Sequence, residues 1–166
     1  FQVLERDPDG VFRHQATHDA GLIKLTQWFQ LDDLQGQTAY VFAGADRFWL
    51  LPSVADAWAR VAVDRYETEL KDVHYSHVEC ADFDGGGDLE LVAVDGKSHV
   101  VEVLAQNAQS WGSRMFWQVF EQNMHYQGRT GGSVEPRQVV LADLTGDGKV
   151  DLALLVHDRV LFYPQQ

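Results

Sequence analysis

The chain has 166 residues, of which 45% are hydrophobic, so it is long enough to fold around a core and is not disordered. Its formal charge is −12, from 25 acidic and 13 basic residues, and we expect no nucleic-acid partner, because phosphate binding depends on Lys and Arg. The excess acid fits either a solvated surface or carboxylates gathered around a cation.

The N-terminal segment has the pattern of two strands joined by a turn. The first strand ends at Leu4, turn-forming residues follow at 7–10, and Val11 and Phe12 begin the second strand. Because the chain starts with Phe1, we expect a processed protein or part of a longer one. No apolar run approaches the roughly 20 residues that a membrane helix needs, and we expect no membrane insertion.

Short apolar segments bounded by Gly, Asp or Asn predict strands along most of the chain. They lie at 40–43, 48–51, 89–94, 100–104, 116–120, 152–156 and 160–163. One window, 53–61, predicts one or two helical turns instead. The expected fold class is therefore all-β. The single cysteine, Cys80, excludes an internal disulfide.

A pattern of loop, apolar strand, turn and second apolar strand recurs in the sequence. Segment 80–106 aligns with 141–165, and 31–52 is a worn third copy that lacks two residues after the loop. Leading strands are expected at 77–80 and 138–141.

Each unit has the organisation of one four-stranded β-propeller blade, and such sheets stack on neighbours because one sheet cannot bury both faces alone. The expected repeats are 17–63, 64–110 and 111–166, with 1–16 as the closing half of a blade. Aromatic residues precede two of the repeats, and we expect them to wedge between blades. They are Trp28, Phe29, Trp111, Phe116, Trp117 and Phe120.

The last repeat contains a nine-residue loop, Asp143–Asp151, that suits calcium. Oxygen-bearing side chains stand at positions 1, 3, 5 and 9, the third position being Thr145 in place of a carboxylate. Calcium takes about 6 to 8 oxygen ligands at about 2.3–2.6 Å, so a tight turn has to direct several oxygens inward. Glycines at positions 4 and 6 allow positive φ, and the carbonyl of Lys149 is the expected main-chain ligand.

The corresponding loop of the middle repeat, Asp82–Glu90, keeps carboxylates at positions 1, 3 and 9 but has Gly86 at position 5. We expect weaker calcium binding or an altered geometry, with water or the side chain of Asp88 in place of the lost ligand. The first loop offers one acid, Asp33, and is not expected to bind metal. In the alternative interpretation all three are Asp/Gly turns without metal.

An EF-hand would require Glu at position 12 and a following helix, whereas position 12 is Ala93 or Leu154 inside an expected strand. The segments DLTGDGKVDLALL and DFDGGGDLELVAV instead resemble the FG-GAP or VCBS-type repeats of integrin-like β-propellers, whose motif is Asp-x-Asp-x-Asp-Gly-x-x-Asp before a hydrophobic strand. The segment DLQGQTAYVF shares only the topology.

In that family the loop joins the first two strands of a blade and holds calcium through side chains at positions 1, 3, 5 and 9 and the carbonyl at position 7. The resemblance implies secretion or a cell-surface location, and it implies Ca²⁺ ligands in both loops. These are Asp82, Asp84, Asp88 through its carbonyl and Glu90, and then Asp143, Thr145, Asp147, Lys149 through its carbonyl and Asp151.

Propellers close with about 4 to 8 blades, and this sequence supplies about three loop-and-strand units. Two explanations stay open. The chain is part of a longer propeller, or a homo-oligomer completes the ring by pairing the C-terminal strand of one copy with the N-terminal strand of another. The second explanation follows from the aggregation hazard of unpaired sheet edges.

No catalytic residues are predicted. His74 and His77 stand three apart and face opposite sides of a strand, Asp95, Ser98 and His99 fit a turn, and Arg129–Ser133 lacks the ending of a phosphate-binding loop. The leading hypothesis is a binding module for a protein or glycan ligand, with structural calcium. The alternatives are a propeller-type polysaccharide lyase or hydrolase and a purely structural spacer in a larger surface protein.

Overall fold

The computed structural model describes residues 2–17, 24–34, 37–52, 64–106, 110–119 and 134–165, and these ranges contain thirteen β-strands and no helix. The all-β prediction is confirmed. The strands are β1 (Gln2–Arg6), β2 (Phe12–Thr17), β3 (Gln27–Leu34), β4 (Gln37–Ala43), β5 (Arg47–Pro52), β6 (Asp64–Glu67), β7 (His77–Ala81), β8 (Glu90–Asp95), β9 (Val100–Gln106), β10 (Trp111–Gln118), β11 (Gln138–Ala142), β12 (Asp151–Val156) and β13 (Arg159–Tyr163). No helix in the described part is long and apolar enough to cross a membrane.

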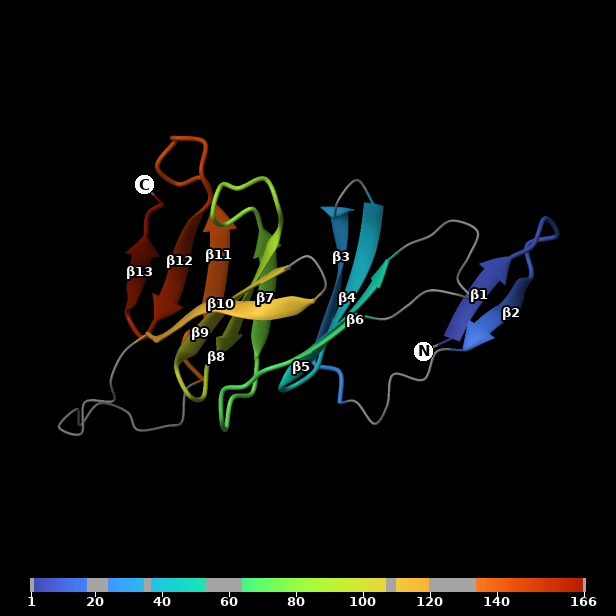
Figure 1. Cartoon of the computed structure of the whole chain (residues 1–166), viewed down its shortest axis with the longest axis horizontal. Coiled ribbons are helices and arrows are strands. Elements are labelled where there is room, and N and C mark those ends of the chain that lie inside the picture. The colour runs from blue at the N-terminus through green and yellow to red at the C-terminus, as the bar shows by residue number, and fades with distance from the viewer. Residues whose placement is uncertain are drawn as a thin grey trace.

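The strands form four antiparallel sheets in which neighbours in the sheet are also neighbours in the chain. We name them the N-terminal hairpin (β1–β2), the first sheet (β3–β6), the middle sheet (β7–β10) and the last sheet (β11–β13). Figure 1 shows the middle sheet between the first and last sheets, with the N-terminal hairpin at the far end of the molecule. The first and middle sheets have four strands, and the last sheet has three in the described residues.

The middle sheet is covered on both faces, and strand β8 is buried along its whole length. Successive side chains of a strand point to opposite faces. Leu91 and Ala93 accordingly lie in one core with residues of the first sheet, whereas Val92 and Val94 lie in a second core with residues of the last sheet. The near-continuous apolar run at 89–94 has this two-sided burial as its physical cause.

A buried carboxylate links the first and middle sheets. Glu102 on β9 is fully buried and accepts hydrogen bonds from the hydroxyls of Tyr66 and Thr68, both at 3.0 Å, and from the hydroxyl of Tyr75. Burial and the neighbouring charge of Glu102 raise the pKa of Tyr66 to about 12, so this hydroxyl stays a donor. Buried charge is costly unless several donors satisfy it, and three do so here.

Most strand predictions from the sequence agree with the structure. The predicted segments 40–43, 48–51, 100–104, 152–156 and 160–163 lie within β4, β5, β9, β12 and β13, and the leading strands are β7 and β11. Strand β10 begins at Trp111 instead of Phe116 because pairing with the long β9 extends it through a stretch with no clear strand pattern. The predicted helical turns at 53–61 lie outside the described residues.

The sheets are offset from the repeat bounds expected from sequence. Strand β6 (64–67) completes the first sheet, and β10 (111–118) completes the middle sheet, although the expected repeats begin at 64 and 111. Each of these strands pairs with the strand before it, and this pairing decides the bounds of the sheet. The loop motifs in the sequence carry no information about that pairing.

The aromatic residues expected between blades divide into two groups. Trp111 is buried in the first core, Phe29 packs against that core, and Trp117 packs against the second core with its ring 5.7 Å from that of Tyr163. Trp28 and Phe116 are instead 65% and 59% exposed, so the prediction is wrong for these two. Both are strand residues whose side chains lie on the face opposite to a packed neighbour. Phe120 lies outside the described residues.

Candidate metal centre

The two Asp/Gly-rich loops, which we call the middle loop (82–90) and the last loop (143–151), lie at equivalent places. The middle loop leads from β7 into β8, and the last loop leads from β11 into β12. The glycines at positions 4 and 6 have φ of 72° and 92° in the middle loop and 79° and 87° in the last loop. No atom of the described residues lies within 4 Å of the Cβ that a larger residue would carry there. Backbone conformation and not space therefore requires these glycines.

The carboxylate at position 9 holds the start of each loop. Glu90 Oε2 accepts the N–H groups of the second and third loop residues at 2.8 and 3.3 Å. Asp151 Oδ2 accepts the same two groups of its own loop, both at 2.9 Å. The two side chains are 2% and 0% exposed. The two loops differ in sequence at most positions but form the same hydrogen bonds. They are therefore structurally equivalent.

The surroundings of these two carboxylates shift their pKa values in opposite directions. Burial raises the pKa of Glu90, aided by the charge of Asp84 and opposed by the two N–H groups and by Arg114. Burial also acts to raise the pKa of Asp151, but N–H groups from Gln165 and from two loop residues outweigh it, and the pKa lies below the ordinary value. Asp151 is thus fully engaged by the backbone, whereas Glu90 has one oxygen directed elsewhere.

The carboxylate at position 1 crosses each loop to the glycine at position 6. Asp82 Oδ2 accepts the N–H of Gly87 at 3.1 Å, and Asp143 Oδ2 accepts the N–H of Gly148 at 2.9 Å. In the last loop Oδ1 of Asp143 also accepts two N–H groups, at 2.6 and 3.1 Å. In the middle loop Oδ1 of Asp82 is buried and has no hydrogen-bond partner among the residues that the structure describes. A buried carboxylate oxygen without a donor is costly, which is a reason to expect a cation beside it.

Three carboxylates meet in the middle loop. Asp82, Asp84 and Glu90 each offer an oxygen, and these oxygens lie within 4.8 Å of one another. Like charges at this spacing repel strongly unless a cation lies between them. Carboxylate oxygens are the ligands of hard divalent cations, so the arrangement can hold such an ion.

The last loop, which the sequence favours as the better site, does not gather its acids in this way. Asp143, Asp147 and Asp151 form no comparable group in the described residues. Their oxygens serve the loop backbone, as where Asp147 Oδ1 accepts the N–H of Lys149 at 2.9 Å. The Thr145 hydroxyl also helps to lower the pKa of Asp151. The side chains of the first loop lie outside the described part of the chain.

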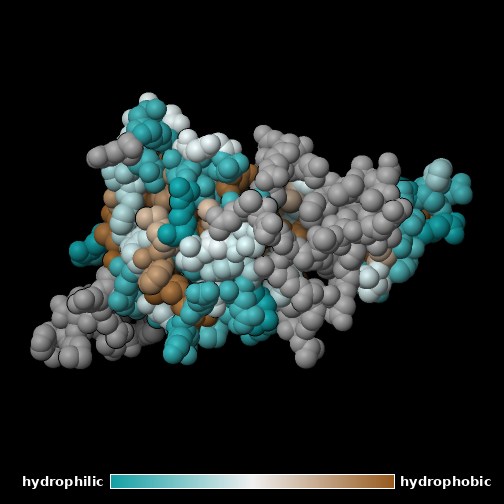
Figure 2. Space-filling model, in the orientation of Figure 1, coloured by the Kyte–Doolittle hydropathy of each residue, from teal (hydrophilic) through white to brown (hydrophobic). Residues whose placement is uncertain are grey.

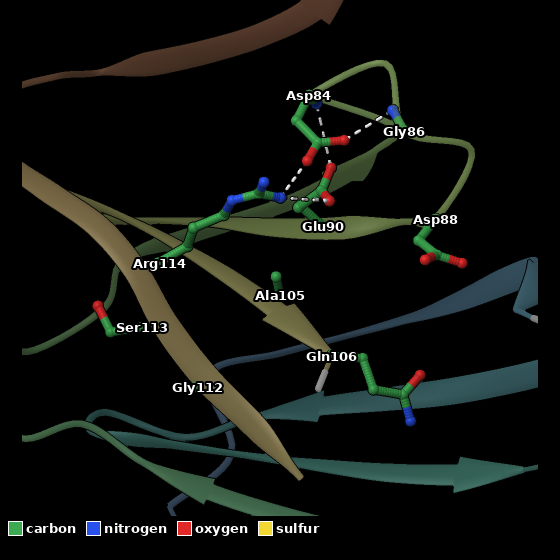
Figure 3. A pocket seen from close by; sticks show the side chains of 9 residues that line it. All are labelled: Asp84, Gly86, Asp88, Glu90, Ala105, Gln106, Gly112, Ser113 and Arg114. Atoms are coloured by element: carbon green, nitrogen blue, oxygen red, sulfur yellow. Dashed lines mark hydrogen bonds and ion pairs between the residues drawn. The ribbon is translucent and has the colours of Figure 1, made fainter. Parts of the chain in front are cut away.

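An arginine that the sequence did not single out faces the middle loop. Arg114 lies in β10 where its pairing with β9 shifts register between Ser113 and Met115, and such a bulge redirects the side chain. Its guanidinium pairs with Asp84 and lies 3.6 Å from Glu90 Oε1 (Figure 3). Arg114 thus partly neutralises two of the three gathered carboxylates. The alternation of side chains between the two faces of a strand does not predict this contact, because the alternation is interrupted at a bulge.

A pocket of about 400 Å³ opens beside the middle loop. The acids Asp84, Asp88 and Glu90 line one side, and Ser113 and Arg114 of β10 line another (Figure 3). Gly86, at position 5, also borders the pocket and contributes no side-chain oxygen. A cation bound by the loop would therefore have an open side toward this space.

The groups that look catalytic in the sequence serve the backbone. Asp95 is fully buried and accepts N–H groups from His74, Lys97 and Ser98 at 2.7 to 3.0 Å, which confirms the turn expected there. His74 is exposed. Ala93 and Leu154, at position 12 of the loops, are buried strand residues, so the loops are not EF-hands. Segment 129–133 lies outside the described residues.

Comparison with protein-family models, curated proteins and solved structures found no match to this chain.

Proposed function

We propose that the chain is a calcium-binding repeat module in which the metal stiffens the loops and the protein works by binding a protein or glycan ligand. In this proposal the three stacked sheets are consecutive blades of a β-propeller related to FG-GAP or VCBS-type repeats. The family relation rests on the loop motifs, and their shared backbone hydrogen bonding supports it.

One observation carries the metal part of the proposal. Asp82 Oδ1 is buried without a donor from the described part of the chain, beside oxygens of Asp84 and Glu90 that lie within 4.8 Å of one another. A bound cation would satisfy the orphaned oxygen and remove the repulsion between the three carboxylates. Asp82, Asp84 and Glu90 are the residues that would hold it, and the ion would supply a fixed positive charge at the end of the middle sheet.

Calcium suits this site better than a transition metal because all the available ligands are oxygens and none of the gathered residues is His or Cys. Arg114 stands against two of the carboxylates, so it has to turn away or share them when the ion binds. We propose Asp143, Thr145, Asp147, Asp151 and the carbonyls of Asp88 and Lys149 as the remaining ligands. To bind the ion, several carboxylate oxygens of the last loop have to release the backbone N–H groups that they accept and bind the ion instead.

The recognition part of the proposal concerns the pocket beside the middle loop. Its walls are polar, and a structural ion at its edge would fix the loop that forms one side. Export to the cell surface or outside the cell suits such a module, since calcium at these locations is abundant enough for weak sites of this kind to be filled.

Thermal unfolding with and without calcium tests the metal part. If calcium is present at about 100 times its Kd, linkage predicts about 2.7 kcal/mol of added stability and a rise in Tm of roughly 5–10 °C. A chelator should reverse the rise, and magnesium at the same concentration should give a smaller one. Glycan and protein arrays probed with and without calcium test the recognition part. Binding signals of equal strength in both conditions would show that ligand recognition does not depend on the metal.

A further inference from the structure

The chain contains four Asp-Gly dipeptides, at 9–10, 84–85, 95–96 and 147–148. In such a pair the backbone N of the glycine can attack the aspartate side chain, because glycine has no Cβ to shield that N and adopts a wide range of backbone angles. Hydrogen bonds hold three of the four glycine N–H groups. Gly10 N–H donates to the carbonyl of Asp7 at 2.9 Å, Gly96 N–H to Ser76 Oγ at 3.1 Å and Gly148 N–H to Asp143 Oδ2 at 2.9 Å.

The fourth glycine, Gly85 of the middle loop, differs from the other three. Its N–H donates to no protein atom in the described part of the chain. Gly85 is exposed, and no described atom lies within 4 Å of the place that a Cβ would take. The middle loop projects from the upper end of the molecule in Figure 1, and Figure 2 shows hydrophilic and neutral atoms there. Two more glycines follow, at 86 and 87, so residue type restrains this stretch of backbone very little.

The side chain of Asp84 is folded back over the N–H of Gly85. Asp84 Oδ1 accepts the N–H of Gly86 at 2.7 Å (Figure 3), and the ring that this hydrogen bond closes contains both Asp84 Cγ and the N of Gly85. Such an Asx turn holds a carboxyl group against the peptide that follows it. Asp147 makes the same bond to the N–H of Lys149, at 2.9 Å. The two Asp-Gly pairs therefore hold their carboxyl groups alike, and they differ in whether the described chain also holds the glycine N–H.

We propose that Asp84 is a site of spontaneous conversion to isoaspartate. The N of Gly85 attacks Cγ of the protonated Asp84 carboxyl group, so that the N–Cγ bond forms and the Cγ–OH bond breaks. The hydroxyl and the amide proton leave together as water, and a five-membered imide results. Water then adds to the main-chain carbonyl carbon of residue 84, and the bond from that carbon to N breaks. The main chain afterwards runs through Cγ, the α-carboxyl group is free, and the mass of the chain is unchanged.

The conversion takes one member out of the group of three carboxylates. It adds a methylene to the main chain and moves the free carboxylate onto Cα, away from the place where Asp84 contacts Gly86 and Arg114. A further consequence rests on the proposed function. Asp84 is one of the residues proposed to hold calcium, so the modified middle loop should bind the ion more weakly. The last loop should keep its affinity, because the N–H of Gly148 is engaged.

Prolonged incubation of the chelator-treated full chain at neutral pH and body temperature tests the proposal. Mass spectrometry with electron-based fragmentation locates isoaspartate at each Asp-Gly pair of one sample, and a guanidinium-unfolded sample gives the rates without structure. We expect similar rates at all four pairs in the unfolded chain. In the folded chain Asp84 should react about tenfold faster than Asp147, because a hydrogen-bonded N–H reacts only after local opening. Equal rates at Asp84 and Asp147 in the folded chain would overturn the proposal.

Two variants test the physical cause of the difference in rate. Asp143→Ala removes the acceptor of the Gly148 N–H, and it should raise the rate at Asp147 toward that at Asp84. Asp84→Glu should abolish the modification in the middle loop, because the longer side chain closes a six-membered ring far less readily. Circular dichroism checks that each variant folds. An unchanged rate at Asp147 in the folded Asp143→Ala chain would contradict the role assigned to the N–H of Gly85.

A parallel incubation with calcium separates this proposal from the proposed metal site. An ion held by the middle loop should slow the conversion of Asp84 and leave the rate at Asp9 unchanged, because binding favours the closed loop. Equal rates at Asp84 with and without calcium would count against the metal site and leave the modification standing. Saturable calcium binding to the middle loop without isoaspartate at Asp84 in the chelated chain would do the reverse.

Discussion

Glu90 and Asp151 hold equivalent loops by the same two backbone hydrogen bonds, but they use their second oxygens differently. Glu90 receives both N–H groups on Oε2 and turns Oε1 toward Arg114, 3.6 Å away. Asp151 receives two on Oδ2 and a third, from Gln165, on Oδ1 at 2.9 Å. The amide variants of the two residues should therefore behave differently.

Glu90→Gln can keep both loop hydrogen bonds with its carbonyl oxygen while losing the charge that a metal needs. We expect little change in the Tm of the chelated protein and a loss of calcium affinity of about tenfold or more at the middle loop, equal to about 1.4 kcal/mol. Calorimetric titration together with thermal melts measures both. A large fall in the metal-free Tm would show that the charge is needed for folding.

Asp151→Asn should destabilise the chain even without calcium. The amide NH₂ group would face a backbone N–H that Asp151 now accepts, so one donor loses its partner. We expect the metal-free Tm to fall by several degrees, in contrast to Glu90→Gln. Equal melting temperatures for the two amide variants would contradict this account of the loops.

Arg114→Gln should raise calcium affinity at the middle loop. The guanidinium now neutralises Asp84 and Glu90, and its removal leaves those carboxylates to the ion. We expect the calcium affinity to increase roughly tenfold, because the positive charge of Arg114 repels the ion across a medium of high dielectric constant. Arg47→Gln makes the same charge change far from the loop, where Arg47 pairs with Asp46 and Glu67, and serves as the control. Equal affinities in both variants would show that Arg114 does not compete with calcium.

Glu102→Ala should be among the most destabilising substitutions in the chain. It leaves the hydroxyls of Tyr66, Thr68 and Tyr75 without their buried acceptor. We expect a loss of roughly 3 kcal/mol in the free energy of unfolding, measured by urea denaturation. Glu102→Gln keeps one acceptor oxygen and should cost clearly less. If both variants unfold like the wild type, the hydroxyl cluster does not hold the first and middle sheets together.

Gly148→Ala tests the claim that φ, and not space, requires glycine in the loops. The residue has φ of 87°, and nothing in the described part of the chain lies within 4 Å of the added Cβ, so the cost is conformational. We expect a loss of about 1–2 kcal/mol. Gly148→Asn should cost less, because Asn adopts positive φ more readily. The reverse order, read from the melting temperatures, would contradict the φ argument.

The sequence predicted the strands best where side-chain alternation or two-sided burial is strong. Strands β8 and β12 contain continuous apolar runs, β9 is apolar around Glu102, and the burial of these segments confirms that interpretation. Strand β10 was predicted only in part, since Gly112, Ser113 and Arg114 carry no strand pattern and follow their partner β9. Tertiary pairing decides such a segment, and no local signal reports it.

The candidate site was predicted in position but not in detail. Regular spacing of Asp and Gly located both loops, and the glycine conformations followed from residue type alone. The number of backbone N–H groups that each acid accepts decides which loop brings its carboxylates together. The spacing of the acids in the sequence does not reveal that number. The contact of Arg114 with the middle loop depends on a bulge 30 residues away in sequence from Asp84, which alternation cannot anticipate.

The central claim is that the gathered carboxylates of the middle loop bind calcium. Calorimetric titration of calcium into the chelator-treated full chain, with the Asp82→Asn, Asp84→Asn double variant as reference, tests it most directly. We predict saturable heat in the wild type that the double variant loses at the middle loop while it stays folded by circular dichroism. Absence of saturable binding in the wild type at millimolar calcium, or identical binding curves for the two proteins, would contradict the claim.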